Sequence, residues 1–211
     1  MKEFINTSFL TFLTLFPILN PPAMAPIFNE LTSHLDEKRQ YKIAYLVSKY
    51  SFYLLSVSLL IGSWILAIFG ISVMIIKIAG GILLFNTAWK MLNEQPKISE
   101  KQKKECIKID EKTAFYPMTL PLTAGAGSIS VTISLTPSKL SLSLNTLSEI
   151  SAIILGIFLS SISIYVFYRY SSYIIKKMDY SKQQIISKLS AFILLAIAIK
   201  MSLDGIKYVL L

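Results

Sequence analysis

The sequence predicts an all-α integral membrane protein with six transmembrane helices, and three observations lead to this fold class. Hydrophobic residues make up 54% of the 211 residues, charged residues only 16%, and the mean hydropathy is +0.59, whereas soluble domains carry about 25% charged residues. Six apolar runs are each long enough to cross a bilayer core of about 30 Å. The basic residues gather in alternate connections between these runs. The runs cover approximately residues 5–28, 43–69, 71–92, 114–136, 147–168 and 188–210.

The distribution of basic residues predicts the orientation of the runs. Lysine and arginine are frequent after the first, third and fifth runs, as at Lys38, Lys103 and Lys176, and rare on the other side, as at Lys2 and Lys139. Cytoplasmic loops of membrane proteins carry the excess of Lys and Arg, so we expect both termini outside the cytoplasm. The net charge of +9 therefore indicates anionic membrane lipid, and not nucleic acid, as the partner of the basic loops.

Two pairs of similar segments indicate an internal repeat of three helices. FPILNPPAMAP from Phe16 and YPMTLPLTAGA from Tyr116 share an aromatic residue and two prolines at the same spacing, and KIAGGILL from Lys77 matches KLSAFILL from Lys188. A repeat with an odd number of crossings is inverted in the membrane, so we expect two inverted three-helix repeats. The expected organisation is one integral membrane domain, 1–211, with repeat one at about 1–95, a cytoplasmic loop at about 93–113 and repeat two at about 114–211.

Prolines and glycines interrupt the first and fourth runs, which predicts that both helices are broken. Proline costs about 3 kcal/mol in a helix interior and restricts the residue before it. Breaks at corresponding positions of two halves indicate a binding site. Helix ends freed there offer amides to an anionic group and carbonyls to a cationic one, an arrangement that suits an amino acid. The predicted substrate-binding residues are Asn20, Pro21, Pro22, Ala23, Pro121, Thr123, Ala124, Gly125, Gly127 and Ser128.

Several of these residues and two further glycines have specific expected roles. Gly125 and Gly127 are expected to adopt backbone dihedrals that other residues disfavour, and Ser128 is expected to cap the half-helix that follows. Gly80 and Gly81, in contrast, are expected to allow close helix packing. Each role is a prediction about backbone geometry that a structure can test.

Two charged residues within the runs are further candidates. Lys77 lies about two turns inside the third run, where a buried cation is costly; it either serves a cavity or extends its ammonium to the membrane surface. Asp204 in the last run is expected to form an ion pair with Lys200 or Lys207. The sequence leaves both readings of Lys77 open.

The residue types in the sequence argue against an enzyme, a metal site and transport driven directly by ATP hydrolysis. The single histidine, His34, and the single cysteine, Cys106, fall in loops, so neither a metal centre nor a cofactor is expected. No Gly-rich segment ends in Gly-Lys-Ser/Thr, the phosphate-binding pattern of ATPases. The favoured function is a secondary transporter of a small neutral solute with a coupling ion, proton or sodium. A membrane protein without transport activity, a helper or remnant, is the alternative, and homo-oligomerisation stays open.

Five segments carry a resemblance to a known family: NPPAMAPIF from Asn20, FGIS from Phe69, KIAGGILLF from Lys77, PMTLPLTAGAG from Pro117 and DGI from Asp204. Together they resemble the MarC family of six-helix inner-membrane proteins. The resemblance implies a multi-pass protein of the bacterial inner membrane and, because related proteins have been linked to transport of glycine and alanine, a transporter-like activity. Three departures leave substrate and activity open: Ala23, Ala126 and Ala191 replace a glycine, a proline and a glycine of the family pattern.

Overall fold

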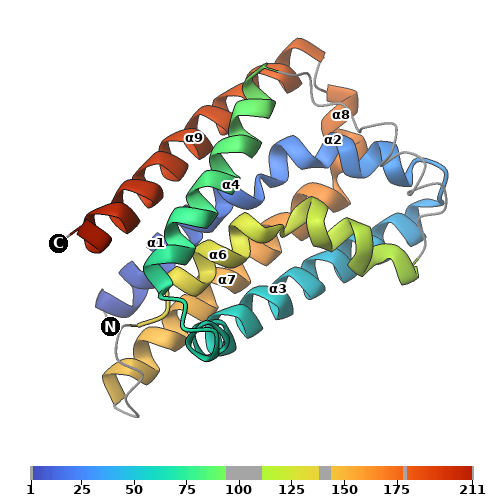
Figure 1. Cartoon of the computed structure of the whole chain (residues 1–211). Coiled ribbons are helices and arrows are strands. Elements are labelled where there is room, and N and C mark those ends of the chain that lie inside the picture. The colour runs from blue at the N-terminus through green and yellow to red at the C-terminus, as the bar shows by residue number, and fades with distance from the viewer. Residues whose placement is uncertain (1, 94–110, 138–143, 178–179, 211) are drawn as a thin grey trace.

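The computed structural model describes residues 2–93, 111–137, 144–177 and 180–210, and these residues are helical apart from short connections (Figure 1). Four continuous helices are long and apolar enough to cross a membrane, as expected for an all-α integral membrane protein. They are α3 (Glu37–Ile68), α4 (Val73–Asn93), α7 (Leu144–Arg169) and α9 (Tyr180–Leu210). Most of the expected cytoplasmic loop at about 93–113 lies outside the described residues.

The first predicted run is a broken helix, as expected. It consists of α1 (Lys2–Leu19) and α2 (Pro21–Thr32), which are bent by 44° at the single residue between them. A short helix, α8 (Ser171–Lys177), follows α7 on the way to α9. By length and composition, the described residues thus provide four continuous spans and one bent span.

The fourth predicted run does not form a helix long enough to count as a sixth span by length and composition. It contains a 3₁₀ turn, η1 (Glu111–Ala114), a wide-turned segment, η2 (Phe115–Thr123), and a nine-residue helix, α6 (Ala126–Ser134). Within η2, Tyr116 and Leu120 have extended backbone with ψ of 126° and 122°. Both residues precede a proline, which disfavours the helical region for the residue before it. The prolines therefore break this run more severely than the first.

A glycine separates the second and third runs. Gly70 adopts a φ of +66°, a conformation that glycine alone adopts without strain. Its amide donates to the Ala67 carbonyl at 3.1 Å, and the Ile71 amide donates to the Leu66 carbonyl at 2.9 Å. These two bonds form a Schellman motif, which satisfies the last carbonyls of α3 and allows α4 to begin three residues later.

Helices α4 and α9 pack against each other in antiparallel orientation (Figure 1). A Cβ built on Gly81 would lie 2.9 Å from the Ala198 carbonyl oxygen, and one built on Gly205 would lie 2.9 Å from the Met74 carbonyl oxygen. One built on Gly80 would overlap the Ser130 side chain of α6. The expectation that Gly80 and Gly81 allow close packing is therefore confirmed.

Helix α7 lies between α1 and α3. It runs parallel to α1, because Thr11 packs on Gly156 and the Phe16 ring lies 6.3 Å from the Phe167 ring. Its contacts with α3 run in the opposite direction along the chain. The Ser48 hydroxyl donates to the Ser161 carbonyl at 2.6 Å, while the rings of Phe52 and Phe158 lie 5.9 Å apart.

The fourth run extends along α3 in parallel orientation. At one end Lys42 forms an ion pair with Glu111, with 2.6 Å between Nζ and Oε2. At the other end Gly62 packs against Ile133. The stretch of α3 from Lys42 to Gly62 is about 30 Å long at 1.5 Å per residue, which equals the thickness of a bilayer core.

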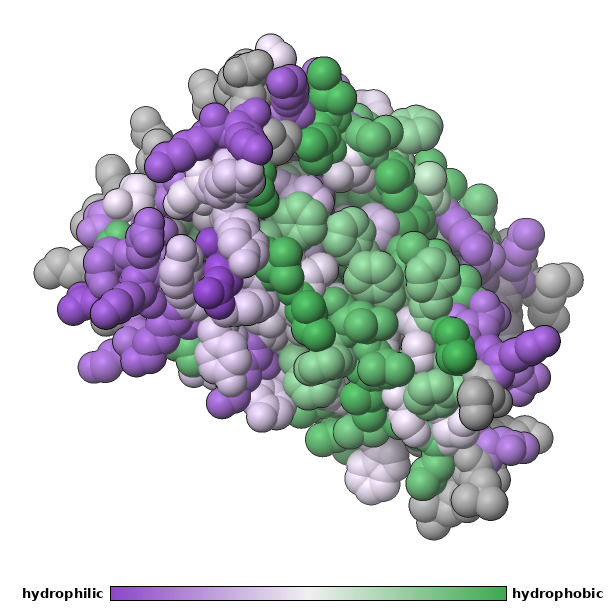
Figure 2. All heavy atoms as spheres, turned by 180° about the vertical axis from the view of Figure 1, so that it is seen from behind, coloured by the Kyte–Doolittle hydropathy of each residue, from purple (hydrophilic) through white to green (hydrophobic). Residues whose placement is uncertain are grey.

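The surface carries the apolar band expected of a membrane protein. Figure 2 shows a broad hydrophobic region with hydrophilic residues gathered on both sides of it. Large exposed side chains such as Trp64, Phe85 and Phe192 come from α3, α4 and α9. So much exposed apolar surface would be costly in water, and it is suited to contact with lipid.

The close packing of α4 on α9 predicts that bulk at Gly81 destabilises the protein. We expect Gly81→Val to lower the free energy of unfolding by about 1–3 kcal/mol, because the Ala198 carbonyl cannot move aside as a flexible side chain can. The measurement is thermal unfolding of the purified protein in detergent. Ala79→Val, which also introduces a valine but at an exposed position of α4, serves as the matched control. Equal unfolding temperatures for the two variants would contradict the packing argument.

Candidate functional site

The first break lies at Asn20, as the sequence predicts. Asn20 has φ 46° and ψ 53°, a left-handed conformation that asparagine tolerates better than most residues. Its amide donates to the Phe16 carbonyl at 2.9 Å and so completes α1. Pro21 and Pro22 form the first turn of α2, where proline has the right φ and its missing amide is not needed.

This first break exposes few backbone amides. Pro21 and Pro22 have none, and the Met24 amide donates to the Asn20 carbonyl at 3.1 Å, so helix geometry leaves Ala23 as the free donor of the first turn. The Asn20 side chain is more unusual. The residue is only 4% exposed, and its Nδ2 has no hydrogen-bond partner among the described residues.

The second break lies at Ala124 and Gly125, within the expected segment. Gly125 is the residue before α6 and has φ −84° and ψ −176°, which is ordinary extended backbone. Gly127 lies inside α6, where a Cβ would come within 2.4 Å of the Leu84 side chain. The expectation of unusual dihedrals is therefore wrong at both glycines, because Gly125 is extended and Gly127 is helical. Gly127 instead allows close packing against α4.

The expectation that Ser128 caps α6 is also wrong. Its hydroxyl donates to the Gly125 carbonyl at 2.8 Å, and the helix start has no side-chain cap. Three consecutive amides, those of Ala126, Gly127 and Ser128, consequently have no partner within the helix. The second break is thus richer in backbone donors than the first.

One buried side chain, Tyr168 of α7, contacts both broken runs. Its ring stacks on Phe28 of α2 with 4.5 Å between centroids, and its hydroxyl lies 2.8 Å from Oγ1 of Thr123 at the end of η2. The Thr123 hydroxyl already donates to the Met118 carbonyl at 2.7 Å, so Tyr168 is the donor in this pair. Thr123 is therefore occupied by two hydrogen bonds and supports the break.

Tyr168 could not be identified from the sequence. Several tyrosines surround it at the end of the fifth run, among them Tyr165 and Tyr170. Aromatic residues at such positions ordinarily lie at the membrane surface. Tyr168 is the exception, being 1% exposed, and its contact with Thr123 joins residues 45 positions apart.

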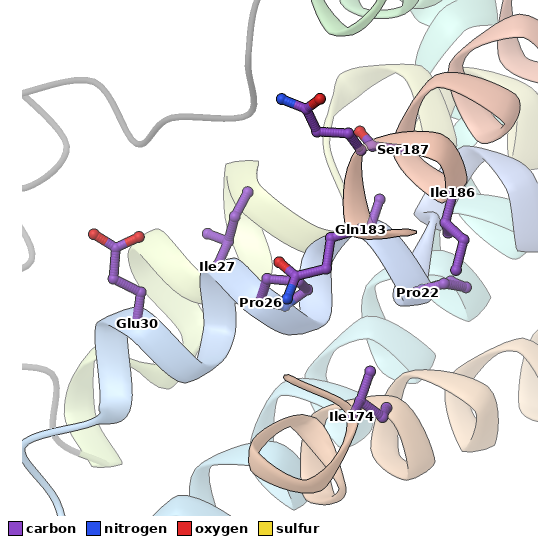
Figure 3. A pocket seen from close by; sticks show the side chains of 10 residues that line it. Pro22, Pro26, Ile27, Glu30, Ile174, Gln183, Ile186 and Ser187 are labelled. Atoms are coloured by element: carbon purple, nitrogen blue, oxygen red, sulfur yellow. The ribbon is translucent and has the colours of Figure 1, made fainter. Parts of the chain in front are cut away.

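A small cavity adjoins the first break. It has a volume of about 170 Å³ and lies between α2, α8 and the first turns of α9. Figure 3 shows side chains from α2 on one side and Gln183, Ile186 and Ser187 of α9 on the other. Ser187 is 3% exposed, and its hydroxyl has no partner among the described residues. The cavity therefore has a mixed wall, with apolar side chains such as Ile27 and Ile186 beside polar ones such as Gln184 and Ser187.

The structure brings together only part of the predicted site. Pro22 and Ala23 line the cavity, and Thr123 is joined to the first run through Tyr168. Asn20 and Pro21 are buried directly before this wall. The remaining predicted residues lie along the fourth run away from the cavity wall: Pro121, Ala124, Gly125, Gly127 and Ser128.

The two charged candidates lie outside this region. Lys77 is half-buried and Asp204 exposed, and neither lines the cavity. In the described part of the chain, Asp204 makes no ion pair with Lys200 or Lys207, so that expectation is wrong. The same residues contain no group of three or more His, Cys, Asp or Glu side chains that could hold a metal ion.

The contact between the two broken runs predicts a measurable role for the Tyr168 hydroxyl. We expect Tyr168→Phe to lower the free energy of unfolding by about 0.5–1.5 kcal/mol, the usual net value of one hydrogen bond. Chemical or thermal unfolding in detergent measures the change. Tyr173→Phe removes a hydroxyl from a 56% exposed side chain and should have no effect. A stability loss of the same size in both variants would argue against the contact.

Comparison with known proteins gives the family. A family model described as "MarC family integral membrane protein" matches residues 5–210. A UPF0056 membrane protein of Aquifex aeolicus is 30% identical over 215 residues, covering 100% of this chain and 97% of its own length. YvbG of Bacillus subtilis, another UPF0056 membrane protein, is 28% identical over 199 residues, covering 93% and 92%. No solved structure matches the chain. The family model and these relatives confirm the resemblance noted in the sequence, and the chain belongs to the MarC family of integral membrane proteins.

Proposed function

We propose that the protein is a secondary transporter that moves a small neutral solute, such as glycine or alanine, across the bacterial inner membrane. The observation that carries this proposal is the buried Asn20 at the break of a membrane segment, whose Nδ2 has no hydrogen-bond partner in the part of the chain that the structure describes. Polar groups at membrane depth are expensive and mark solute pathways. The proposal includes no catalytic step and no cofactor.

The second break adds complementary chemistry. The free amides at the start of α6 are suited to a negatively charged group such as a carboxylate. Tyr168 ties this break to the first run through Thr123 and Phe28. Two interrupted segments linked in this way support a solute path between the halves of the chain, as in transporters with inverted repeats.

The directions of the helices support six crossings with both termini outside the cytoplasm. Parallel packing of α1 with α7, and antiparallel packing of α3 with α7 and of α4 with α9, are what six alternating crossings require. The fourth run crosses beside α3 in this proposal. Figure 1 shows the N- and C-termini at the same end of the molecule, with the turn from α2 to α3 and helix α8 at the other end.

In this arrangement, transport consists of rocking the two halves about their contacts. Residues of about 1–95 and about 114–211 would form the two inverted repeats, and the close α4–α9 contact would be their main interface. A proton or sodium gradient would drive the movement, because no ATP-binding segment is present in the sequence.

Uptake of labelled glycine and alanine into proteoliposomes, with imposed proton or sodium gradients, tests the proposal. The informative pair of variants is Asn20→Gly and Asn20→Ala. Glycine keeps the left-handed backbone but removes the carboxamide, so we expect Asn20→Gly to fold normally and to weaken solute binding by about 1–3 kcal/mol. Asn20→Ala should lose the same binding energy and also destabilise the fold.

The control is uptake by the parent protein under each gradient. Full activity of Asn20→Gly would refute a role of the carboxamide in solute binding. Background uptake by the parent for both amino acids under every gradient would instead favour the alternative, a membrane protein of this family without transport activity.

A further inference from the structure

The cavity between α2, α8 and α9 is built on the broken run itself. Pro22 and Ala23, the second and third residues of α2, form part of its wall. Figure 3 shows Ile174 of α8 and Ile186 of α9 beside it. Because α8 lies in a basic connection between the fifth and sixth runs, the cavity lies toward the end of the molecule opposite to the termini (Figure 1).

The size and charge of the cavity restrict what it can hold. Its volume of about 170 Å³ is below the approximately 300–1,000 Å³ of sites for drug-sized ligands. Among the described residues, no lysine or arginine lines it, and Glu30 is the charged residue of the wall. A net anion would therefore lose its hydration without gaining a counter-charge, which is costly.

Gln183, Gln184 and Ser187 of α9 bring polar groups to the cavity wall, and the Ser187 hydroxyl is the one that is buried without a hydrogen-bond partner among the described residues. Buried hydroxyls are almost always hydrogen-bonded, and leaving one without a partner costs about 1–3 kcal/mol. Ser187 is buried and unpartnered among the described residues. Its Oγ is enclosed in this conformation, but its side chain forms part of the cavity wall, so a turn of that side chain would let a molecule in the cavity supply the missing bond. The lack of a hydrogen-bond partner for this hydroxyl among the described residues and the presence of the cavity are independent observations, and both concern Ser187.

We infer that this cavity is where the transported solute first binds from the α8 end, before it reaches Asn20, with the Ser187 hydroxyl as the hydrogen-bonding group that selects it there; this inference rests on the proposed transport function. The class of solute is a small molecule without net negative charge that offers a hydrogen-bonding group to the hydroxyl. The solute reaches the cavity from the end of the molecule that carries α8.

The chain offers a matched control for a purely structural role. Ser51 of α3 is 0% exposed, its hydroxyl also lacks a partner among the described residues, and it does not line the cavity. Removing an unpartnered hydroxyl from a buried site is neutral or stabilising when nothing binds to it. Ser51→Ala and Ser187→Ala should therefore behave alike in stability and differ only in ligand binding.

The experiment is calorimetric titration of the full-length protein in lipid nanodiscs with alanine, glycine and aspartate as probes. We expect the parent to bind alanine and glycine but not aspartate. Ser187→Ala should weaken alanine binding about threefold to tenfold, the equivalent of one hydrogen bond, and Ser51→Ala should leave it unchanged. Ile186→Trp, which fills the cavity from a half-buried position, should abolish binding.

The outcomes separate this inference from the proposed function. If Ser187→Ala binds alanine as tightly as Ser51→Ala does, or a folded Ile186→Trp keeps the parent affinity, the cavity assignment is overturned while transport stands. Tight binding of aspartate would also overturn the assigned solute class. If the parent neither binds nor transports glycine or alanine, the proposed function fails and this inference fails with it.

Discussion

A backbone that leaves the helical conformation at membrane depth must satisfy its polar groups from within the protein, and this constraint shapes both broken runs. At the first break, Asn20 donates through its amide to Phe16 and accepts through its carbonyl from Met24. Two prolines follow, and they have no amide to leave unpaired. A left-handed asparagine before two prolines therefore interrupts a membrane helix while leaving few backbone groups unsatisfied.

At the second break, threonine hydroxyls satisfy backbone carbonyls of η1 and η2, while the first amides of α6 have no partner within the helix. The wide turns of η2 are closed by the Thr119 hydroxyl, which donates to the Ala114 carbonyl at 2.8 Å, and by the Thr123 hydroxyl on the Met118 carbonyl. Tyr168 completes the set by donating to Thr123. The same side chain that satisfies the fourth run also packs on the first, so the two interruptions are held in one structural unit.

The sequence predicted the positions of the breaks because proline acts locally. The extended conformation of Tyr116 and Leu120 is the one that a following proline favours, although Phe16 and Ala25 remain helical before Pro17 and Pro26. Glycine is less informative, because it can indicate either an unusual dihedral or a close contact, and only the neighbouring helix decides between them. The sequence predicts an unusual dihedral at Gly127, but the structure shows a close contact, since the Leu84 side chain lies against it.

The parts of the candidate site that depend on distant contacts could not be predicted. Ser187 and Pro22 line the same cavity only because α8 brings the start of α9 back onto α2. No local sequence pattern predicts this change of chain direction. The tyrosine that joins the breaks likewise resembles its neighbours in sequence and differs from them only in burial. The proposed function therefore rests on Asn20, which the sequence motif identifies, whereas the cavity assignment rests on Ser187, which only the fold identifies.

The central claim is that each half of the chain sends one interrupted segment across the membrane, and the fourth run tests it most directly because its helix is too short to be recognised as a span. Single cysteines at Lys112 and Pro137, one at each end of that run, are introduced after Cys106→Ser and treated with an impermeant thiol reagent in intact cells. The account predicts that position 137 is labelled from outside and position 112 only after permeabilisation. Labelling of both positions from the same side would show that the fourth run re-enters without crossing and would contradict the account.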